Sequence, residues 1–354
     1  ILYHTSLTPR KLIVYRMKRT KSYEILMRKI LSIDGGGIRG VFPASFLAAL
    51  EEDLDAPLGQ YFDLISGTST GGIIAIGLAM GMSAREILEL YETEGAGIFY
   101  QDGHGLTAWV GRKFRKARWL AWGAKYPTER LRTALESILG EKRIGDARTR
   151  LMIPSWHRQT KTVYVYKTAH HERLRTDYKD LAVDAALATA AAPTFFKEHI
   201  TANDVGLVDG GLWANNPVGY AVAEAIGVLK WPVEELKVLS VSCLEDIGKT
   251  KPSYSARTMV TKTADFFMAG QSHGSLGLAH ILTGDPHERK AIWRICQPAP
   301  DGDFTLDDTS RIRDLKDRGF VEARQQKPIL TPHFFTEPAE AFVPVHKLEG
   351  DDRA

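Results

Sequence analysis

Short apolar runs alternate with stretches of helical period from residue 30 onward. The apolar run 30–33 precedes a helical pattern over 43–54, and the run 62–66 precedes another over 70–81. Such alternation is typical of an α/β fold with a mainly parallel central sheet flanked by helices. Further strands are expected at 162–166, 205–208, 237–242 and 291–296.

Helix start signals add detail to this pattern. Ser83 and Glu86 have the spacing of a capping box, which predicts a helix to about residue 91, and Pro127 with Glu129 opens another that ends near 139. Further helices are expected over 217–229, 257–282 and 309–325.

The same pattern predicts three parts of the chain. Residues 27–243 are expected to form the catalytic domain, and 244–354 a C-terminal α+β region that completes the fold. Residues 1–26 are expected to be an N-terminal extension outside that fold. They start at Ile1 and scatter basic residues without the apolar stretch of a signal peptide, so Met17 or Met27 is an alternative start.

Composition narrows the classes of protein. Apolar residues make up 44% and charged residues 25% of the 354 positions, as in an ordinary soluble protein. A net charge of +3 is too small to indicate a DNA or RNA partner. Cys243 and Cys296 suit reduced core thiols, which favours a cytoplasmic location. No apolar run approaches the roughly 18 residues of a spanning helix.

Candidate chemistry begins with the run Gly67-Thr68-Ser69-Thr70-Gly71, directly after an apolar run. It has the G-x-S-x-G form of a nucleophile elbow, in which a strand-to-helix turn presents a serine. A Cβ at Gly67 or Gly71 would collide with neighbouring backbone, and the helix N-terminus favours negative charge at Ser69. The alternative is a glycine-rich turn without chemistry.

A glycine loop lies at residues 34–40, where the sequence is D-G-G-G-I-R-G. Gly35, Gly36 and Gly37 leave backbone N–H groups uncovered, which predicts an anion-binding nest beside the positive charge of Arg39. The glycines also satisfy the dinucleotide fingerprint G-x-G-x-x-G. That interpretation requires an acidic residue at the end of a second strand, whereas the next strand here leads into the serine motif.

A third motif is Asp209-Gly210-Gly211, which follows the apolar run 205–208. It places a carboxylate at a strand end, where glycines allow a substrate or another backbone to approach closely. The alternative is an ordinary Asp-Gly turn. In company with a serine elbow, Asp209 is better interpreted as the base.

These three motifs together resemble the patatin-like phospholipases, over about residues 30–242. In that family D-G-G-G-x-R-G supplies the oxyanion hole, G-x-S-x-G the nucleophile and D-G-G the second member of a Ser–Asp dyad. The resemblance implies a three-layer patatin-like fold with Ser69 as nucleophile and Asp209 as general base. It also implies that Gly35, Gly36 and Gly37 with Arg39 surround the oxyanion.

Residues 190–196 resemble the family's S-x-A-A-P-x-x-F segment. Thr189 or Ala190 stands where the family has serine. We expect this difference not to touch the dyad.

The resemblance implies a serine hydrolase that cleaves acyl esters of membrane glycerophospholipids, a chemistry that needs no metal and no cofactor. Lysophospholipids or small acyl esters are alternative substrates, because the dyad does not encode pocket shape. A nucleotide-binding sensory module and an inactive lipid scaffold are alternatives of other classes. A Ser–Asp–His triad is a rival mechanism, with His199, His273 or His280 as the histidine.

The segment 112–122 combines five basic residues with two tryptophans. This composition fits peripheral contact with anionic lipid headgroups, and a solvated basic helix is the alternative. The candidate membrane contacts are Arg115, Lys116, Arg118, Trp119 and Trp122.

The length and layout of the C-terminal region are similar to bacterial patatin-like effectors of antiphage defence, in which a cyclic nucleotide switches on phospholipase activity. That similarity implies a cyclic dinucleotide activator or a surface for homo-oligomers, and ordinary completion of the fold is the alternative. The candidate phosphate contacts are Arg289, Arg294, Arg311 and Arg313.

Overall fold

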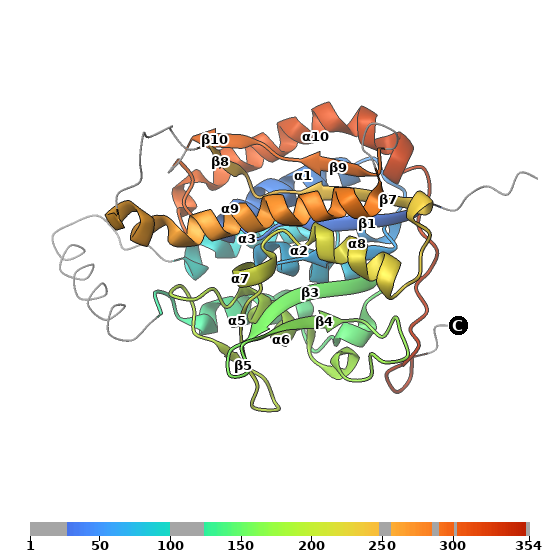
Figure 1. Cartoon of the computed structure of the whole chain (residues 1–354), viewed down its shortest axis with the longest axis horizontal. Helices are drawn as coiled ribbons and strands as arrows, with labels where there is room; N and C mark the ends of the chain where they lie inside the picture. The colour runs from blue at the N-terminus through green and yellow to red at the C-terminus, as the bar shows by residue number, and fades with distance from the viewer. Residues whose placement is uncertain (1–26, 100–123, 248–255, 285–289, 301–302, 352–354) are drawn as a thin grey trace, which may run out of the picture.

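The computed structural model describes residues 27–99, 124–247, 256–284, 290–300 and 303–351. Their core is an eight-stranded sheet with the order β5-β6-β3-β2-β1-β7-β9, in which β4 also pairs with β3 (Figure 1). Its strands are β1 (Arg28–Ile33), β2 (Leu64–Gly67), β3 (Arg150–His157), β4 (Thr162–Lys167), β5 (His199–Ile200), β6 (Gly206–Asp209), β7 (Leu236–Val241) and β9 (Ile292–Ile295).

The strands β3, β2, β1, β7 and β9 run parallel, while β4 and β6 pair with β3 in the antiparallel sense. The parallel strands β8 (Glu245–Ile247) and β10 (Pro298–Pro300) form a separate pair. The mainly parallel sheet expected from the sequence is therefore present.

Helices cover both faces of the sheet, and the side chains of each strand alternate between them. Leu31 of β1 joins the core beneath α1, α2, α3 and α10, whereas Ile30 joins the core beneath α8 and α9. The α-helices are α1 (Val41–Glu51), α2 (Thr70–Ala79), α3 (Ala84–Ile98), α5 (Thr128–Leu139), α6 (Ala182–Ala190), α7 (Gly211–Ala214), α8 (Val218–Gly227), α9 (Ala256–Thr283) and α10 (Ile312–Phe334). The 3-10 helices are η1 (Gly37–Gly40), η2 (Leu58–Tyr61), η3 (Ile144–Asp146), η4 (Asp177–Lys179), η5 (Val233–Glu235) and η6 (Thr309–Arg311).

The predicted strands and helices are present with shifted ends, and the capping box of Ser83 and Glu86 is formed. Strand β3 and helix α6 have no counterpart among the predicted elements, and neither do the short elements β5, β8, β10 and α7. Pro154 obscures β3, because proline is rare in central strands. It lies between residues 150–152, which pair with β2, and residues 155–157, which pair with β6.

Helix α10 is longer than expected. It continues to Phe334 although it contains Pro328 and Pro332, each of which removes a helix hydrogen bond. Leu330 and Phe334 are completely buried in the core, so packing stabilises turns that local sequence disfavours.

Three predictions lie outside the described residues: the extension 1–26, the membrane-contact segment 112–122, and Arg289. Within the described part of the chain, no helix is both long enough and apolar enough to cross a bilayer. The boundaries proposed at residues 27 and 244 stay a prediction.

Candidate active site

Ser69 lies at the turn from β2 to α2, at the carboxyl edge of the parallel strands. Its backbone has φ 54° and ψ −124°, a strained conformation for a non-glycine residue. A Cβ on Gly67 would lie 2.0 Å from the carbonyl oxygen of Gly71, and a Cβ on Gly71 would lie 2.5 Å from that of Asp34. The turn therefore has the tight geometry of a nucleophile elbow.

Asp209 ends β6 and faces the serine. The hydroxyl of Ser69 donates to Asp209 Oδ2 at 2.7 Å, and the N–H of Gly211 donates to Oδ1 at 2.6 Å. Burial raises the pKa of Asp209 to about 6, although both hydrogen bonds favour its charged form. Such a carboxylate is ionised near neutral pH and is still basic enough to take a proton from a hydroxyl group.

The glycine loop follows β1 and lines the same cavity as the serine. The backbone N–H groups of Gly36 and Gly37 have no hydrogen-bond partner among the described residues, so both can bind an anion. Gly37 has φ +56°, and a Cβ there would lie 2.2 Å from the carbonyl oxygen of Leu306.

Gly35 has a different role from the one expected. Its N–H donates to the carbonyl oxygen of Asn215 at 2.9 Å, so this amide is already paired and does not donate to an oxyanion. A Cβ on Gly35 would lie 2.6 Å from Asn215 Oδ1 and 3.2 Å from Ser69 Cβ. Glycine is needed here because the loop passes close to the elbow.

Arg39 also lines the cavity, and only 9% of it is exposed. Its Nε donates to the carbonyl oxygen of Gly36 at 3.5 Å. The Arg39 side chain therefore lies beside the glycine loop, and its role at an oxyanion stays a prediction.

Thr189 contacts the backbone of Ser69, which the sequence did not reveal. Its Oγ1 accepts a hydrogen bond from the N–H of Ser69 at 3.0 Å and donates to the carbonyl oxygen of Pro154 at 2.6 Å. Position 189 therefore contacts the backbone of the nucleophile, and the exchange of serine for threonine, which we expected to leave the dyad untouched, keeps the hydroxyl that makes this contact. A hydroxyl on Cβ is what the geometry requires, and threonine supplies it as serine would.

The cavity above the dyad has a volume of about 600 Å³. Apart from the polar groups at its base, its lining is mainly apolar. The apolar lining includes Ile73, Leu90, Ile98, Phe99, Leu131, Leu135, Phe195, Phe196, Leu212, Phe267 and Leu306. An aliphatic chain fits such a lining.

No histidine is among the described residues that line this cavity. His199 instead lies 3.3 Å from Asp184, measured from Nε2 to Oδ1, and is buried at β5. His273 and His280 belong to α9. The geometry favours a direct contact between serine and carboxylate over a triad.

A family model described as patatin-like phospholipase matches residues 31–222, which is more than half of the chain. The chain belongs to the patatin-like phospholipase family. It is therefore a phospholipase-type ester hydrolase, with the three-layer patatin fold that the resemblance implied.

Several curated relatives have names more specific than that of the family. A cGAMP-activated phospholipase of Vibrio cholerae is 36% identical over 250 residues, which are 68% of this chain and 69% of the relative. A protein of the same name from Pseudomonas aeruginosa is 38% identical over 53% of this chain and 54% of the relative. The solved structure of VipD from Legionella pneumophila covers 86% of this chain and 67% of its own, with 13% identity and a TM-score of 0.43.

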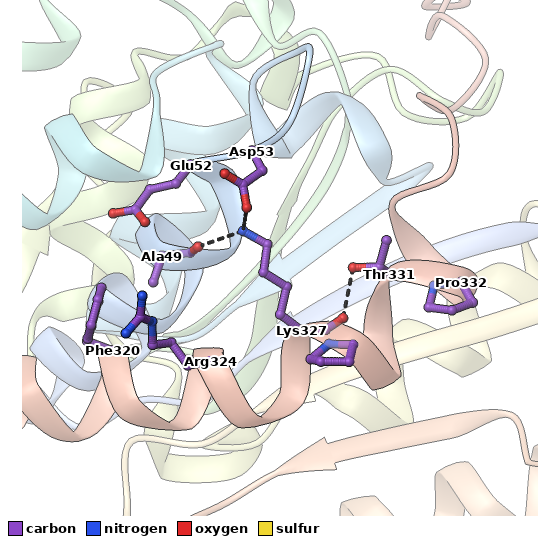
Figure 2. A pocket seen from close by; sticks show the side chains of 9 residues that line it. Ala49, Glu52, Asp53, Phe320, Arg324, Lys327, Thr331 and Pro332 are labelled. Carbon is purple, nitrogen blue, oxygen red and sulfur yellow. Dashed lines mark hydrogen bonds and ion pairs between the residues drawn. The ribbon is translucent and has the colours of Figure 1, made fainter.

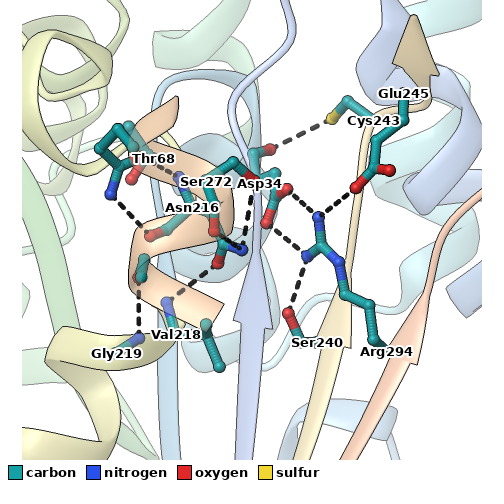
Figure 3. Close-up of polar contacts among 12 residues, drawn as sticks. Asp34, Thr68, Asn216, Val218, Gly219, Ser240, Cys243, Glu245, Ser272 and Arg294 are labelled. Carbon is teal, nitrogen blue, oxygen red and sulfur yellow. Dashed lines mark hydrogen bonds and ion pairs between the residues drawn. The ribbon is translucent and has the colours of Figure 1, made fainter. Parts of the chain in front are cut away.

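Arg294 of this patatin-like protein is not available for a phosphate. Its guanidinium pairs with the buried Asp34 and lies 3.6 Å from Glu245 Oε1, so its assignment as a phosphate contact is wrong (Figure 3). Arg311 Nε lies 2.7 Å from Asp314 Oδ2, and Arg313 is exposed on α10.

A second cavity of the patatin-like protein lies between α1 and α10 (Figure 2). Its volume is about 580 Å³, and it shares no lining residue with the cavity above the dyad. Arg324 and Lys327 are balanced there by Glu52 and Asp53, and Lys327 Nζ contacts Asp53 Oδ2 at 2.6 Å. This balance of charge selects neither an anionic nor a cationic ligand.

Proposed function

We propose that this protein hydrolyses fatty acyl esters of membrane glycerophospholipids through a dyad of Ser69 and Asp209. The observation that carries the proposal is the 2.7 Å hydrogen bond between the serine hydroxyl and a buried carboxylate whose pKa is about 6. In this mechanism Asp209 takes the hydroxyl proton while Ser69 Oγ attacks the ester carbonyl.

The attack forms a tetrahedral intermediate with a negatively charged oxygen. The N–H groups of Gly36 and Gly37 would donate to that oxygen, and Arg39 would add positive charge nearby. Collapse of the intermediate breaks the C–O bond, and the leaving alkoxide takes the proton from Asp209. Water then attacks the acyl-enzyme and gives a proton to Asp209. The bond between the acyl carbon and Ser69 Oγ breaks, the serine takes that proton back, and the fatty acid is released.

The apolar lining of the cavity supports a long acyl chain as the group that is bound. Because phospholipids are presented in a bilayer, the enzyme would act while peripherally bound to the membrane surface. Lysophospholipids and simple acyl esters are the second candidate substrates, since the same lining accepts a single chain.

Regulation by a cyclic dinucleotide is supported by the relatives that are named cGAMP-activated phospholipases. Under this proposal cGAMP, or a similar cyclic dinucleotide, raises hydrolysis without taking part in the chemistry. A change of oligomeric state is one route by which it could do so.

The test is release of free fatty acid from vesicles of mixed glycerophospholipids, with and without cGAMP. We expect Ser69→Ala and Asp209→Asn to lose at least about a thousandfold in kcat. A fluorophosphonate probe should label the wild type and not Ser69→Ala. Full activity of Ser69→Ala would refute the dyad, whereas equal rates with and without cGAMP would refute only the activation.

Vesicles, lysophospholipid micelles and a short p-nitrophenyl ester are compared in the same assay. Hydrolysis of the last two without hydrolysis of vesicles would favour the second candidate. Stoichiometric binding of cGAMP without any labelling of Ser69 would favour a sensory module.

A further inference from the structure

The acidic residue of the glycine loop is held by an arginine from β9, the edge strand that β7 separates from β1. Arg294 of β9 donates two parallel hydrogen bonds to Asp34, from Nη1 to Oδ1 at 2.9 Å and from Nη2 to Oδ2 at 2.6 Å (Figure 3). Nη1 also donates to Ser240 Oγ at 2.8 Å. Bidentate pairs of this kind fix direction as well as distance.

The backbone of Asp34 is fixed too. Its N–H donates to the carbonyl oxygen of Val241 at 3.0 Å, and its carbonyl oxygen accepts from Cys243 Sγ at 3.1 Å. Only 4% of Asp34 is exposed, so water does not weaken these contacts. The start of the glycine loop therefore cannot turn independently of β7 and β9.

The other end of the loop is held in a similar way. The N–H of Ile38 donates to the carbonyl oxygen of Leu306 at 2.8 Å. Arg294 and Leu306 both lie beyond residue 222, where the family match ends. Residues outside the matched region thus fix both ends of the loop.

The unpaired N–H groups of Gly36 and Gly37 lie between these fixed ends. Glycine peptides rotate easily, so the direction of these donors depends on how firmly the neighbouring residues are held. Donors to an oxyanion are effective only when they point at the place where charge develops.

We infer that Arg294 is a positioning residue for the oxyanion-binding amides and acts on them through Asp34. Arg294 does not line the cavity, so it does not contact the substrate. The inference rests on the proposed function, because an oxyanion forms only if Ser69 attacks an ester.

Loss of one partner would leave a buried charge unpaired, so a single variant also loses stability. The double variant Asp34→Asn, Arg294→Gln removes both charges together. Arg28→Gln is a matched control, because Arg28 pairs with the buried Asp63 at 3.0 Å at the opposite end of β1.

The experiment measures kcat, KM and melting temperature with p-nitrophenyl butyrate, with and without cGAMP, for wild type, Ser69→Ala and these variants of the full chain. We expect Arg294→Gln and the double variant to lose roughly 10- to 100-fold in kcat, with KM changed less than about twofold. The double variant should melt at a higher temperature than Arg294→Gln and still have a low kcat. Arg28→Gln should lower the melting temperature and leave kcat within about twofold.

The inference is overturned if kcat recovers along with melting temperature in the double variant, or if folded Arg294→Gln keeps the wild-type kcat. Failure of the proposed function has a different signature. Wild type and Ser69→Ala would then hydrolyse the ester at the same rate, and both proposals would fall.

Discussion

The hydroxyl of Thr189 accepts a hydrogen bond from the backbone N–H of Ser69 at 3.0 Å. This contact joins α6 to the nucleophile elbow, and the second hydrogen bond of Thr189, to Pro154, fixes the direction of the hydroxyl. The strained backbone of Ser69 is thus held from outside the turn.

Replacing that hydroxyl tests its role. Thr189→Val keeps the shape of the side chain but leaves the part-buried N–H of Ser69 without this acceptor. We expect kcat to fall about tenfold and stability to fall by about 1–3 kcal/mol, because an unpaired buried donor carries that cost. Thr189→Ser keeps the hydroxyl and should retain most of the activity. Equal rates for the valine and serine variants would show that the contact is dispensable.

The pH dependence of hydrolysis should report Asp209. Burial raises its pKa to about 6, and only the ionised form can accept the proton of Ser69. We therefore expect kcat/KM to be level above about pH 7 and to fall tenfold per pH unit well below 6. A rate profile with soluble ester, over a range where the protein stays folded, measures this. A midpoint near pH 4 would show that the free carboxyl group has its ordinary pKa.

The elbow should not accept a side chain at Gly71. A Cβ there would lie 2.5 Å from the carbonyl oxygens of both Ile33 and Asp34. We expect Gly71→Ala to destabilise the fold by at least about 2 kcal/mol, measured by urea unfolding, because backbone cannot move aside cheaply. Gly97→Ala in α3 is the control. A Cβ there meets nothing within 4 Å, so the change should stabilise by about 0.5–1 kcal/mol.

The preference of the enzyme for long or short acyl chains should depend on the side chains of α5 that line the cavity. Ala134 lines the cavity and is 4% exposed, so Ala134→Phe would fill part of the space. We expect a lower kcat/KM for a palmitoyl ester and little change for a butyryl ester. Thr133→Phe, at an exposed position of the same helix, should leave kcat/KM unchanged for both the palmitoyl and the butyryl ester. Parallel losses for both chain lengths would mean that the substitution disturbs the dyad rather than the chain-binding space.

The elements and turns that were predicted from the sequence are those that depend on residues close together in the chain. Apolar runs followed by helical periods revealed β1, β2 and their helices, and glycine spacing revealed the elbow. Strand β3 was missed because a proline such as Pro154 is rare inside a strand. The strand tolerates it because Pro154 lies between the residues that pair with β2 and those that pair with β6. Arg294 was misassigned because its sequence neighbours give no sign of Asp34, which lies 260 residues away.

The sequence alone determined the α/β class, the family and the order of the three motifs, because each depends on residues close together in the chain. Only the tertiary structure decided which loop amides remain unpaired, since the N–H of Gly35 is taken by Asn215 and those of Gly36 and Gly37 are not paired with any described residue. It also decided that Thr189 holds Ser69 across 120 residues. Contacts of this kind arise when distant strand ends meet at one edge of a sheet, and no local pattern encodes them.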